Sequence, residues 1–180
     1  MSDLPGTAGA ANIMREIGAL AAWSVTSAKP GNGVELLRDG STDTYWQSDG
    51  AQPHLVNIQF PKRVDLSELH VYLDFKSDES YTPSRLAVRV GSTHHDLKDV
   101  CIVELREPMG WVVVPLAATQ PSQHLRAFHV QVAVLANHQN GRDTHMRQVL
   151  VYGPANSAAR GLGDAAMFDS LEFNCYSTMR

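Results

Sequence analysis

Apolar and polar residues alternate with a two-residue period along most of the middle of the chain. In one run, Leu69, Val71 and Leu73 fall on one side of an extended backbone, and the residues between them fall on the other. Runs of this kind lie at 54–60, 69–75, 85–90, 100–105, 111–116, 128–135 and 148–152. Proline and glycine between the runs end them, because proline lacks a ladder donor and glycine relaxes the backbone. Short strands with one core-facing side each predict an all-β sandwich.

Few segments show helical periodicity, and the domain boundaries are indicated by changes in composition. Residues 34–38, which follow a turn-forming stretch, predict a turn or two of helix. The first dozen residues are small and polar, and after Gly153-Pro154 the composition turns to Ala, Gly, Ser and Asp without alternation. A chain of 180 residues suits one domain with a sizeable core. We therefore expect a disordered segment at 1–14, one domain at 15–154 and a flexible tail at 155–180.

Charge and cysteine content restrict the expected partners and the compartment. The net charge of −4 gives no electrostatic footprint for nucleic acid or for an anionic membrane. The longest apolar stretch near the start, 17–23, is far shorter than the roughly 20 residues that cross a bilayer. No positively charged start and apolar core of a secretory signal is present. Cys101 and Cys175 are typical of reduced thiols, so we expect the nucleus and cytoplasm.

One polar segment stands between the last two apolar runs. Residues 137–147 read NHQNGRDTHMR and carry hardly an apolar atom. A loop that only reverses the chain needs about two to five residues. The length and the polar composition therefore predict a recognition surface, and an ordinary solvated loop is the alternative.

A second segment, 39–48, runs from short oxygen-bearing side chains into two aromatic residues. In the structural interpretation, Asp and Ser side chains satisfy backbone amides in a turn, and Trp46 covers the sandwich core. In the alternative, Asp39 and Asp43 ligate calcium, although the segment lacks the charge count of a dedicated site. For zinc, the candidate ligands His138, Asp143 and His145 lack a cysteine partner and the HExxH spacing. We predict no metal and no cofactor, and the sequence leaves calcium binding open.

Three long blocks of the chain resemble a known family. They are 23–60, which includes DGSTDTYWQS; 74–91, DFKSDESYTPSRLAVRVG; and 131–154, QVAVLANHQNGRDTHMRQVLVYGP. Together they closely resemble the DOC domain, the family of the tenth subunit of the anaphase-promoting complex. The resemblance covers about residues 15–154. It implies a jelly-roll β-sandwich of the galactose-binding or discoidin-like type, without catalytic activity. It also implies a subunit of a multisubunit ubiquitin ligase that binds destruction-box degrons together with a WD40 coactivator.

The resemblance also assigns a degron-facing surface and a docking tail. The residues at the matching positions are Ser80, Tyr81, Asn137, Arg142, Asp143, Thr144 and His145. Asn137 offers a donor and an acceptor to a peptide backbone, and Tyr81 offers flat apolar area. In the structural alternatives, Arg142 and Asp143 only screen each other, and Tyr81 packs its loop against the sandwich.

The end of the chain resembles the family's Ile-Arg tail, which docks on a tetratricopeptide-repeat scaffold subunit. Here Met179 and Arg180 keep the apolar side chain, the guanidinium and the carboxylate, and 155–167 serves as a tether. The alternative is a frayed terminus. The implied partners are this scaffold subunit, the cullin and other scaffold subunits, the WD40 coactivator and destruction-box substrates.

The alternatives from other functional classes are a binding module outside such a complex and an enzyme. An intracellular discoidin-like module that binds carbohydrate or peptide outside such a complex is compatible with the fold, because fold does not determine function. An enzyme is disfavoured, because the chain shows no nucleophile elbow, phosphate loop or zinc-protease spacing.

Overall fold

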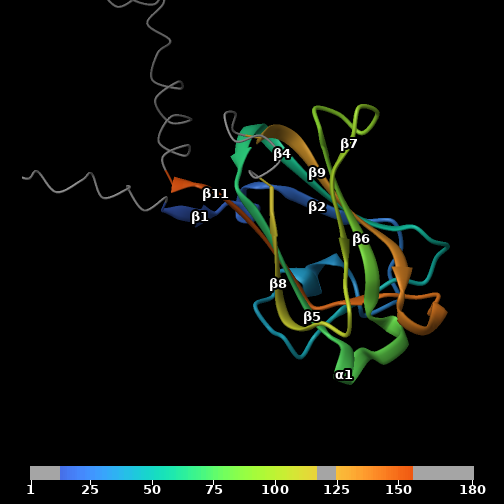
Figure 1. Ribbon diagram of the computed structural model, residues 1–180. Helices are drawn as coiled ribbons and strands as arrows, with labels where there is room; N and C mark the ends of the chain where they lie inside the picture. The colour runs from blue at the N-terminus through green and yellow to red at the C-terminus, as the bar shows by residue number, and fades with distance from the viewer. Residues whose placement is uncertain (1–12, 117–124, 156–180) are drawn as a thin grey trace, which may run out of the picture.

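Two antiparallel sheets form the body of the molecule (Figure 1). The computed structural model describes residues 13–116 and 125–155. The four-stranded sheet has the order β1 (Met14–Glu16), β11 (Gln148–Pro154), β5 (Glu68–Asp74), β8 (Met109–Pro115). The five-stranded sheet has the order β2 (Ala22–Val25), β4 (His54–Leu66), β9 (Leu125–Asn137), β6 (Pro83–Gly91), β7 (Lys98–Glu104). The all-β prediction is confirmed, and each predicted strand coincides with a long strand of the two sheets.

Four strands were not predicted from the sequence. They are β1, β2 and a separate two-stranded sheet of β3 (Trp46–Gln47) with β10 (His145–Met146). Two to four residues are too few to establish an alternation, so only tertiary pairing defines these strands. β1 also corrects the expected boundary, because Met14 lies in a strand and pairs with Pro154. Residues 1–12 and all of the tail beyond residue 155 lie outside the described residues.

The core lies between the facing sides of the two sheets. Val130, Val132 and Val134 on β9 are fully buried, as are Leu69 and Val71 on β5. Each such side chain contributes about 1.5–3 kcal/mol by leaving water. Register therefore follows from the alternation, since a shift by one residue would turn these side chains outward. Trp46 is also fully buried and donates its Nε1 hydrogen to the Ser27 carbonyl, at 2.9 Å.

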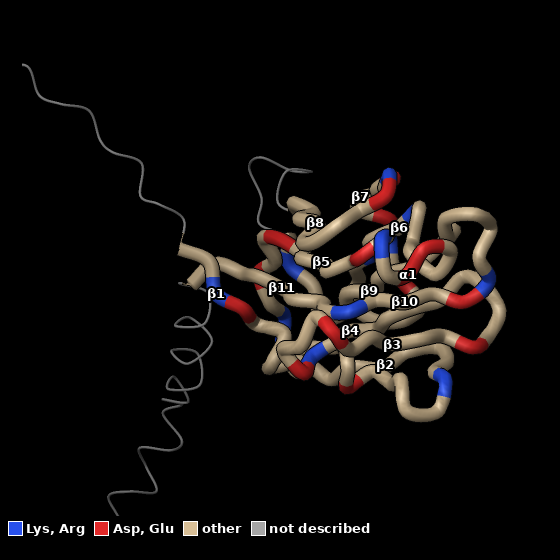
Figure 2. Tube along the Cα trace, turned by 90° about the horizontal axis from the view of Figure 1, so that it is seen from below, with Lys and Arg blue, Asp and Glu red and all other residues tan. Residues whose placement is uncertain are grey.

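Short helical turns occupy the connections. The predicted helix is present as a 3-10 turn, η2 (Val34–Leu37), and η1 (Gly18–Leu20) precedes it. Three further turns gather near one end of the sandwich: α1 (Phe75–Asp78), η3 (Glu79–Tyr81) and η5 (His138–Asn140). No helix within 13–116 and 125–155 combines the length and apolar character needed to cross a membrane. Positively and negatively charged residues are interspersed along the chain (Figure 2).

We call the end that carries these turns the rim. It comprises residues 44–48, 78–82 and 137–147. Strands β3 and β10 lie side by side within it (Figure 2), and β1 lies at the opposite end of the sandwich (Figure 1). The rim contains the polar segment that the sequence marked as a recognition surface.

Candidate functional site

The polar segment 137–147 divides into two parts with different environments. Residues 139–140 are exposed with φ of +53° and +55°, and Arg142 is exposed. From Thr144 to Gln148 every residue is buried, and β10 within this stretch pairs with β3. The second part is therefore not the ordinary solvated loop that the sequence left as an alternative. Its polar side chains are buried because each finds partners inside the protein.

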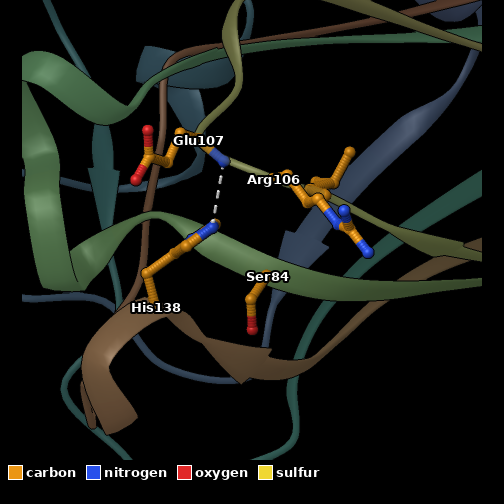
Figure 3. A pocket seen from close by; sticks show the side chains of 5 residues that line it. Ser84, Arg106, Glu107 and His138 are labelled. Atoms are coloured by element: carbon orange, nitrogen blue, oxygen red, sulfur yellow. Dashed lines mark hydrogen bonds between the residues drawn. The ribbon is translucent and has the colours of Figure 1, made fainter.

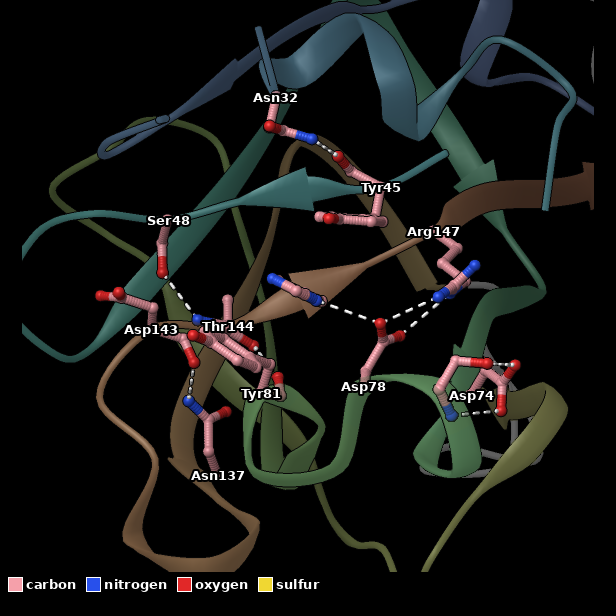
Figure 4. Close-up of polar contacts among 12 residues, drawn as sticks. Asn32, Tyr45, Ser48, Asp74, Asp78, Tyr81, Asn137, Asp143, Thr144 and Arg147 are labelled. Carbon is pink, nitrogen blue, oxygen red and sulfur yellow. Dashed lines mark hydrogen bonds and ion pairs between the residues drawn. The ribbon is translucent and has the colours of Figure 1, made fainter. Parts of the chain in front are cut away.

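The centre of the buried part is an ionic cluster on Asp78 (Figure 4). Arg147 donates from Nε to Asp78 Oδ2 at 2.9 Å and from Nη2 to Oδ1 at 2.8 Å. His145 Nδ1 lies 3.0 Å from the same Oδ1. Burial tends to raise the pKa of Asp78, but hydrogen bonds from His145 and Arg147 outweigh this effect and keep the pKa below its ordinary value. The hydrogen bond to Asp78 in turn raises the pKa of Arg147, so the pair is ionised.

Three aromatic rings are stacked next to this cluster. The His145 ring lies 4.1 Å from the Tyr45 ring on one side and 4.2 Å from the Tyr81 ring on the other, with interplanar angles of 22° and 11°. The Arg147 guanidinium lies 5.5 Å from the Tyr45 ring centroid, a cation–π contact. Tyr81 is 39% exposed, so the stack reaches the surface at Tyr81. The suggestion that Tyr81 only packs its loop is half right, because one ring face packs and the side chain remains accessible.

The exposed part of the segment is held by side chains beneath it. Asn137 donates from Nδ2 to the carbonyls of Gly141 (3.2 Å) and Asp143 (2.8 Å). His54 donates from Nε2 to the Arg142 carbonyl at 2.7 Å. A Cβ on Gly141 would lie 1.8 Å from the Ser80 carbonyl oxygen, so only glycine permits this approach of the two turns. The peptide backbone at the rim therefore has a defined conformation.

His138 connects the rim to the β7–β8 connection. Its Nδ1 lies 3.0 Å from the Thr82 carbonyl, and its Nε2 accepts from the Glu107 amide at 3.2 Å. This pattern needs the neutral ring with the hydrogen on Nδ1. Ser84, Leu105 and Arg106 complete an open hollow of about 510 Å³ beside it (Figure 3).

Unused hydrogen-bonding atoms are concentrated at or directly beneath the rim. Among the described residues, the buried side-chain atoms without a partner are His54 Nδ1, Thr82 Oγ1, Asn137 Oδ1, His145 Nε2 and both ring nitrogens of His129. All but those of His129 belong to the rim or to His54, which holds it from below. Leaving such an atom unpaired costs about 1–3 kcal/mol. Groups of this kind are available to a water molecule, an ion or a ligand.

All seven predicted degron-facing residues come together at the rim, but their exposure differs. Ser80, Tyr81, Arg142 and Asp143 are at least partly accessible, and no ion pair joins Arg142 to Asp143 within the described part of the chain. Asn137 (5%), Thr144 (0%) and His145 (8%) are buried. Thr144 donates from Oγ1 to the Tyr81 carbonyl at 3.3 Å, and Ser48 Oγ accepts from the Thr144 amide at 2.9 Å.

Three residues complete this arrangement but were not predicted as site residues: Tyr45, Asp78 and Arg147. Asp78 lies in a short polar stretch without period, so no pattern marked it. Tyr45 lies in the predicted turn beside Trp46, and Arg147 ends the polar segment 137–147, so neither position indicates a specific role. Their roles depend on contacts between segments more than 60 residues apart.

The 39–48 segment has the contacts expected from its structural interpretation. Asp39 Oδ1 accepts from the Ser41 amide at 2.9 Å and from Gln148 Nε2 at 2.6 Å, and its Oδ2 accepts from Thr44 Oγ1 at 2.5 Å. These bonds engage both carboxylate oxygens. Within the described ranges, no group of three or more His, Cys, Asp or Glu side chains is arranged to hold a metal ion.

Comparison with solved structures confirms the fold. A family 32 carbohydrate-binding module from Clostridium perfringens, solved in complex with galactose, matches with a TM-score of 0.64 over 78% of this chain and 99% of its own length. A second module from the same organism, in complex with GalNAc-β-1,3-galactose, matches with a TM-score of 0.62 over 74% of this chain and 96% of its own. Identity is 14% and 11%, so the likeness shows the galactose-binding, discoidin-like fold alone.

Comparison of sequences defines the family. The model described as "Anaphase-promoting complex, subunit 10 (APC10)" matches residues 4–178. The "Anaphase-promoting complex subunit 10" of Homo sapiens is 50% identical over 167 residues, which cover 93% of this chain and 89% of that protein. Its namesake in Drosophila melanogaster is 48% identical over 93% of this chain and 86% of that protein, and the one in Schizosaccharomyces pombe is 41% identical over 92% and 87%. The chain belongs to the family of subunit 10 of the anaphase-promoting complex.

Proposed function

We propose that this chain is a non-catalytic subunit of an anaphase-promoting ubiquitin ligase and that its rim binds the destruction-box degron of a substrate, next to a WD40 coactivator. Family membership supports the assembly, because the curated relatives are named as subunits of that complex. The composition of the rim supports degron binding. The rim contains the seven family-matched residues, and it also contains buried side-chain atoms that have no hydrogen-bond partner in the described structure.

The accessible groups suit an extended peptide. Tyr81 offers apolar area already held in place by His145, so binding loses little side-chain entropy. Arg142 and Asp143 offer a cation and an anion, unpaired with each other, on a backbone held by Asn137 and His54. Contacts of this kind are individually weak, and a coactivator in the same assembly supplies the effective concentration that makes them sufficient.

The test uses the ligase reconstituted with its coactivator and a destruction-box substrate. Arg142→Ala combined with Asp143→Ala should shorten the ubiquitin chains added per encounter, because it removes charged contacts without touching the core. Arg63→Ala is the matched control, because Arg63 is an exposed arginine of β4 that lies outside the rim. Equal chain lengths for the double variant and for the control would contradict the proposal.

Assembly through the tail is a separate part of the proposal. Met179 and Arg180 lie outside the described residues, and we propose that they dock on a tetratricopeptide-repeat scaffold subunit, with the cullin and other scaffold subunits completing the assembly in nucleus and cytoplasm. Deletion of both residues should reduce co-purification of the chain with the ligase. Undiminished co-purification would rule out the anchoring role.

A further inference from the structure

Asp78 bonds to two other residues of the rim, His145 and Arg147. It is 5% exposed and accepts three hydrogen bonds, two from Arg147 and one from His145. Since its pKa lies below the ordinary value of 3.8, the carboxylate is ionised at neutral pH and can only accept. Arg147 is itself fixed by donating from Nη1 to the Thr42 carbonyl at 2.7 Å. The carboxylate therefore occupies a defined position between three segments of the chain.

This carboxylate determines which nitrogen of His145 is left for other partners. Because Asp78 has no hydrogen to give, the hydrogen between the two groups resides on His145 Nδ1. The stacked rings of Tyr45 and Tyr81 oppose rotation of the imidazole plane. Nε2 is thus held in a fixed direction, buried and without a partner in the described part of the chain.

The same residue anchors the turn that carries Tyr81. Asp78 ends α1, and the next residue, Glu79, has φ +45°, a backbone conformation that L side chains rarely adopt. The turn η3 then brings Tyr81 onto His145 at 4.2 Å. Because the bidentate bond to Arg147 connects this turn to the chain beyond β10, movement of Asp78 would displace Tyr81 and His145 together.

We infer that Asp78 is the positioning residue of the degron-binding surface: it holds His145 so that Nε2 is offered to an amide N–H of an extended peptide, and it holds Tyr81 above it. This inference rests on the proposed function. In the neutral ring with its hydrogen on Nδ1, Nε2 accepts, so the ligand group that fits this form is an amide donor of the peptide backbone or of an Asn or Gln side chain. Nε2 itself is buried, so the inference requires neighbouring atoms to move when a peptide binds; of the two tyrosines that stack on His145, Tyr81 is the more exposed.

The first measurement reads the histidine directly and needs no ligand. In the full chain with ¹⁵N-labelled histidine, long-range proton–nitrogen spectra report which nitrogen carries the hydrogen. Neutral His145 should carry it on Nδ1 in the wild type, and Asp78→Asn should produce a mixture, because an amide both donates and accepts. Glu16→Gln is the matched control, since Glu16 also pairs with an arginine, Arg38 at 2.9 Å, at the opposite end of the sandwich. A hydrogen on Nε2 in the wild type, or an unchanged pattern in Asp78→Asn, overturns the inference.

The second measurement reads binding in the ligase reconstituted with its coactivator. At a temperature where circular dichroism shows all variants folded, Asp78→Asn should weaken destruction-box peptide affinity about tenfold, which corresponds to about 1.4 kcal/mol. Glu16→Gln should bind as the wild type does. If both variants weaken peptide affinity equally, or if Asp78→Asn keeps full affinity, the inference about Asp78 is overturned but the proposed function is not. If the wild-type chain adds no affinity beyond that of the coactivator, the proposed function fails and the binding role of Asp78 fails with it.

Discussion

The two parts of the segment 137–147 have equally polar sequences but opposite structural roles. In 138–143, the side chain of Arg142 extends into solvent, and the backbone is held from below by Asn137 and His54. In 144–147, Thr144 and Arg147 are buried and bonded to residues 63 and 69 positions earlier in the chain. Polarity in a sequence therefore does not indicate exposure. A polar side chain can be buried wherever the fold brings a partner to it.

The difference follows from where each part lies relative to the sheets. The first part crosses the end of the sandwich, where Gln139, Asn140 and Arg142 are exposed. The second part returns into the fold as β10, pairs with β3 and continues into β11. It must therefore pass between α1 and the 39–48 segment, where Asp78 and the Thr42 carbonyl satisfy Arg147.

The largest effect should come from breaking the buried ion pair. Arg147→Met removes both hydrogen bonds to Asp78 and leaves a carboxylate that is 5% exposed without its guanidinium. Losing one member of a buried pair costs about 3–5 kcal/mol. Urea unfolding of the full chain measures this, with Arg142→Met as the control from the exposed part. If both arginine variants lost the same stability, the contrast between the two parts would not hold.

A smaller effect is expected at the junction of the two parts. Gly141→Ala places a methyl group against the Ser80 carbonyl, so the turns 79–81 and 138–141 must separate. Overpacking of this kind costs about 1–3 kcal/mol. Thermal unfolding should show the loss, and peptide binding at the rim should weaken because Tyr81 and Arg142 move apart. An unchanged melting temperature would indicate that this approach of the two turns is not maintained in solution.

The third effect depends on pH and isolates Asp78. The folded-state pKa of Asp78 is depressed, so its contribution to stability is present above the ordinary value of 3.8 and is lost as pH falls through the lower folded-state pKa. Asp78→Asn should therefore be less stable than the wild type at pH 7, and the gap should narrow in acid. Urea midpoints measured from pH 7 down to pH 2 check this. A constant gap across that range would contradict the ionised cluster.

The smallest effect should come from the exposed part. Arg142→Ala removes a side chain without a hydrogen bond or ion pair in the described structure, so the free energy of unfolding should change by no more than about 0.5 kcal/mol. Degron affinity in the assembled ligase should still fall. Loss of stability without loss of affinity would reverse the roles assigned to the two parts.

The long strands and the core were predictable because alternation is a local property. The alternation within a few residues predicts a buried face formed by Val130, Val132 and Val134. All three are buried in β9, as expected. The family resemblance located the rim residues Tyr81 and Arg142 in the same way, from contiguous sequence. Asp78, Tyr45 and the burial of His145 were not predictable, because each depends on a contact between distant segments.

The sequence by itself determined that this chain folds as an all-β sandwich and which of its long strands have a core-facing side, and the family resemblance implied a binding surface formed by loops at one end. Alternating hydrophobicity and turn chemistry act within a few residues, so they can be read along the chain. Only the tertiary structure decided which polar groups at that end remain available to a ligand. Asp78 engages Arg147 and one nitrogen of His145, and leaves the other nitrogen unpaired. That outcome depends on distances between side chains from α1, β10 and the 39–48 segment, which pack together only when the sandwich closes.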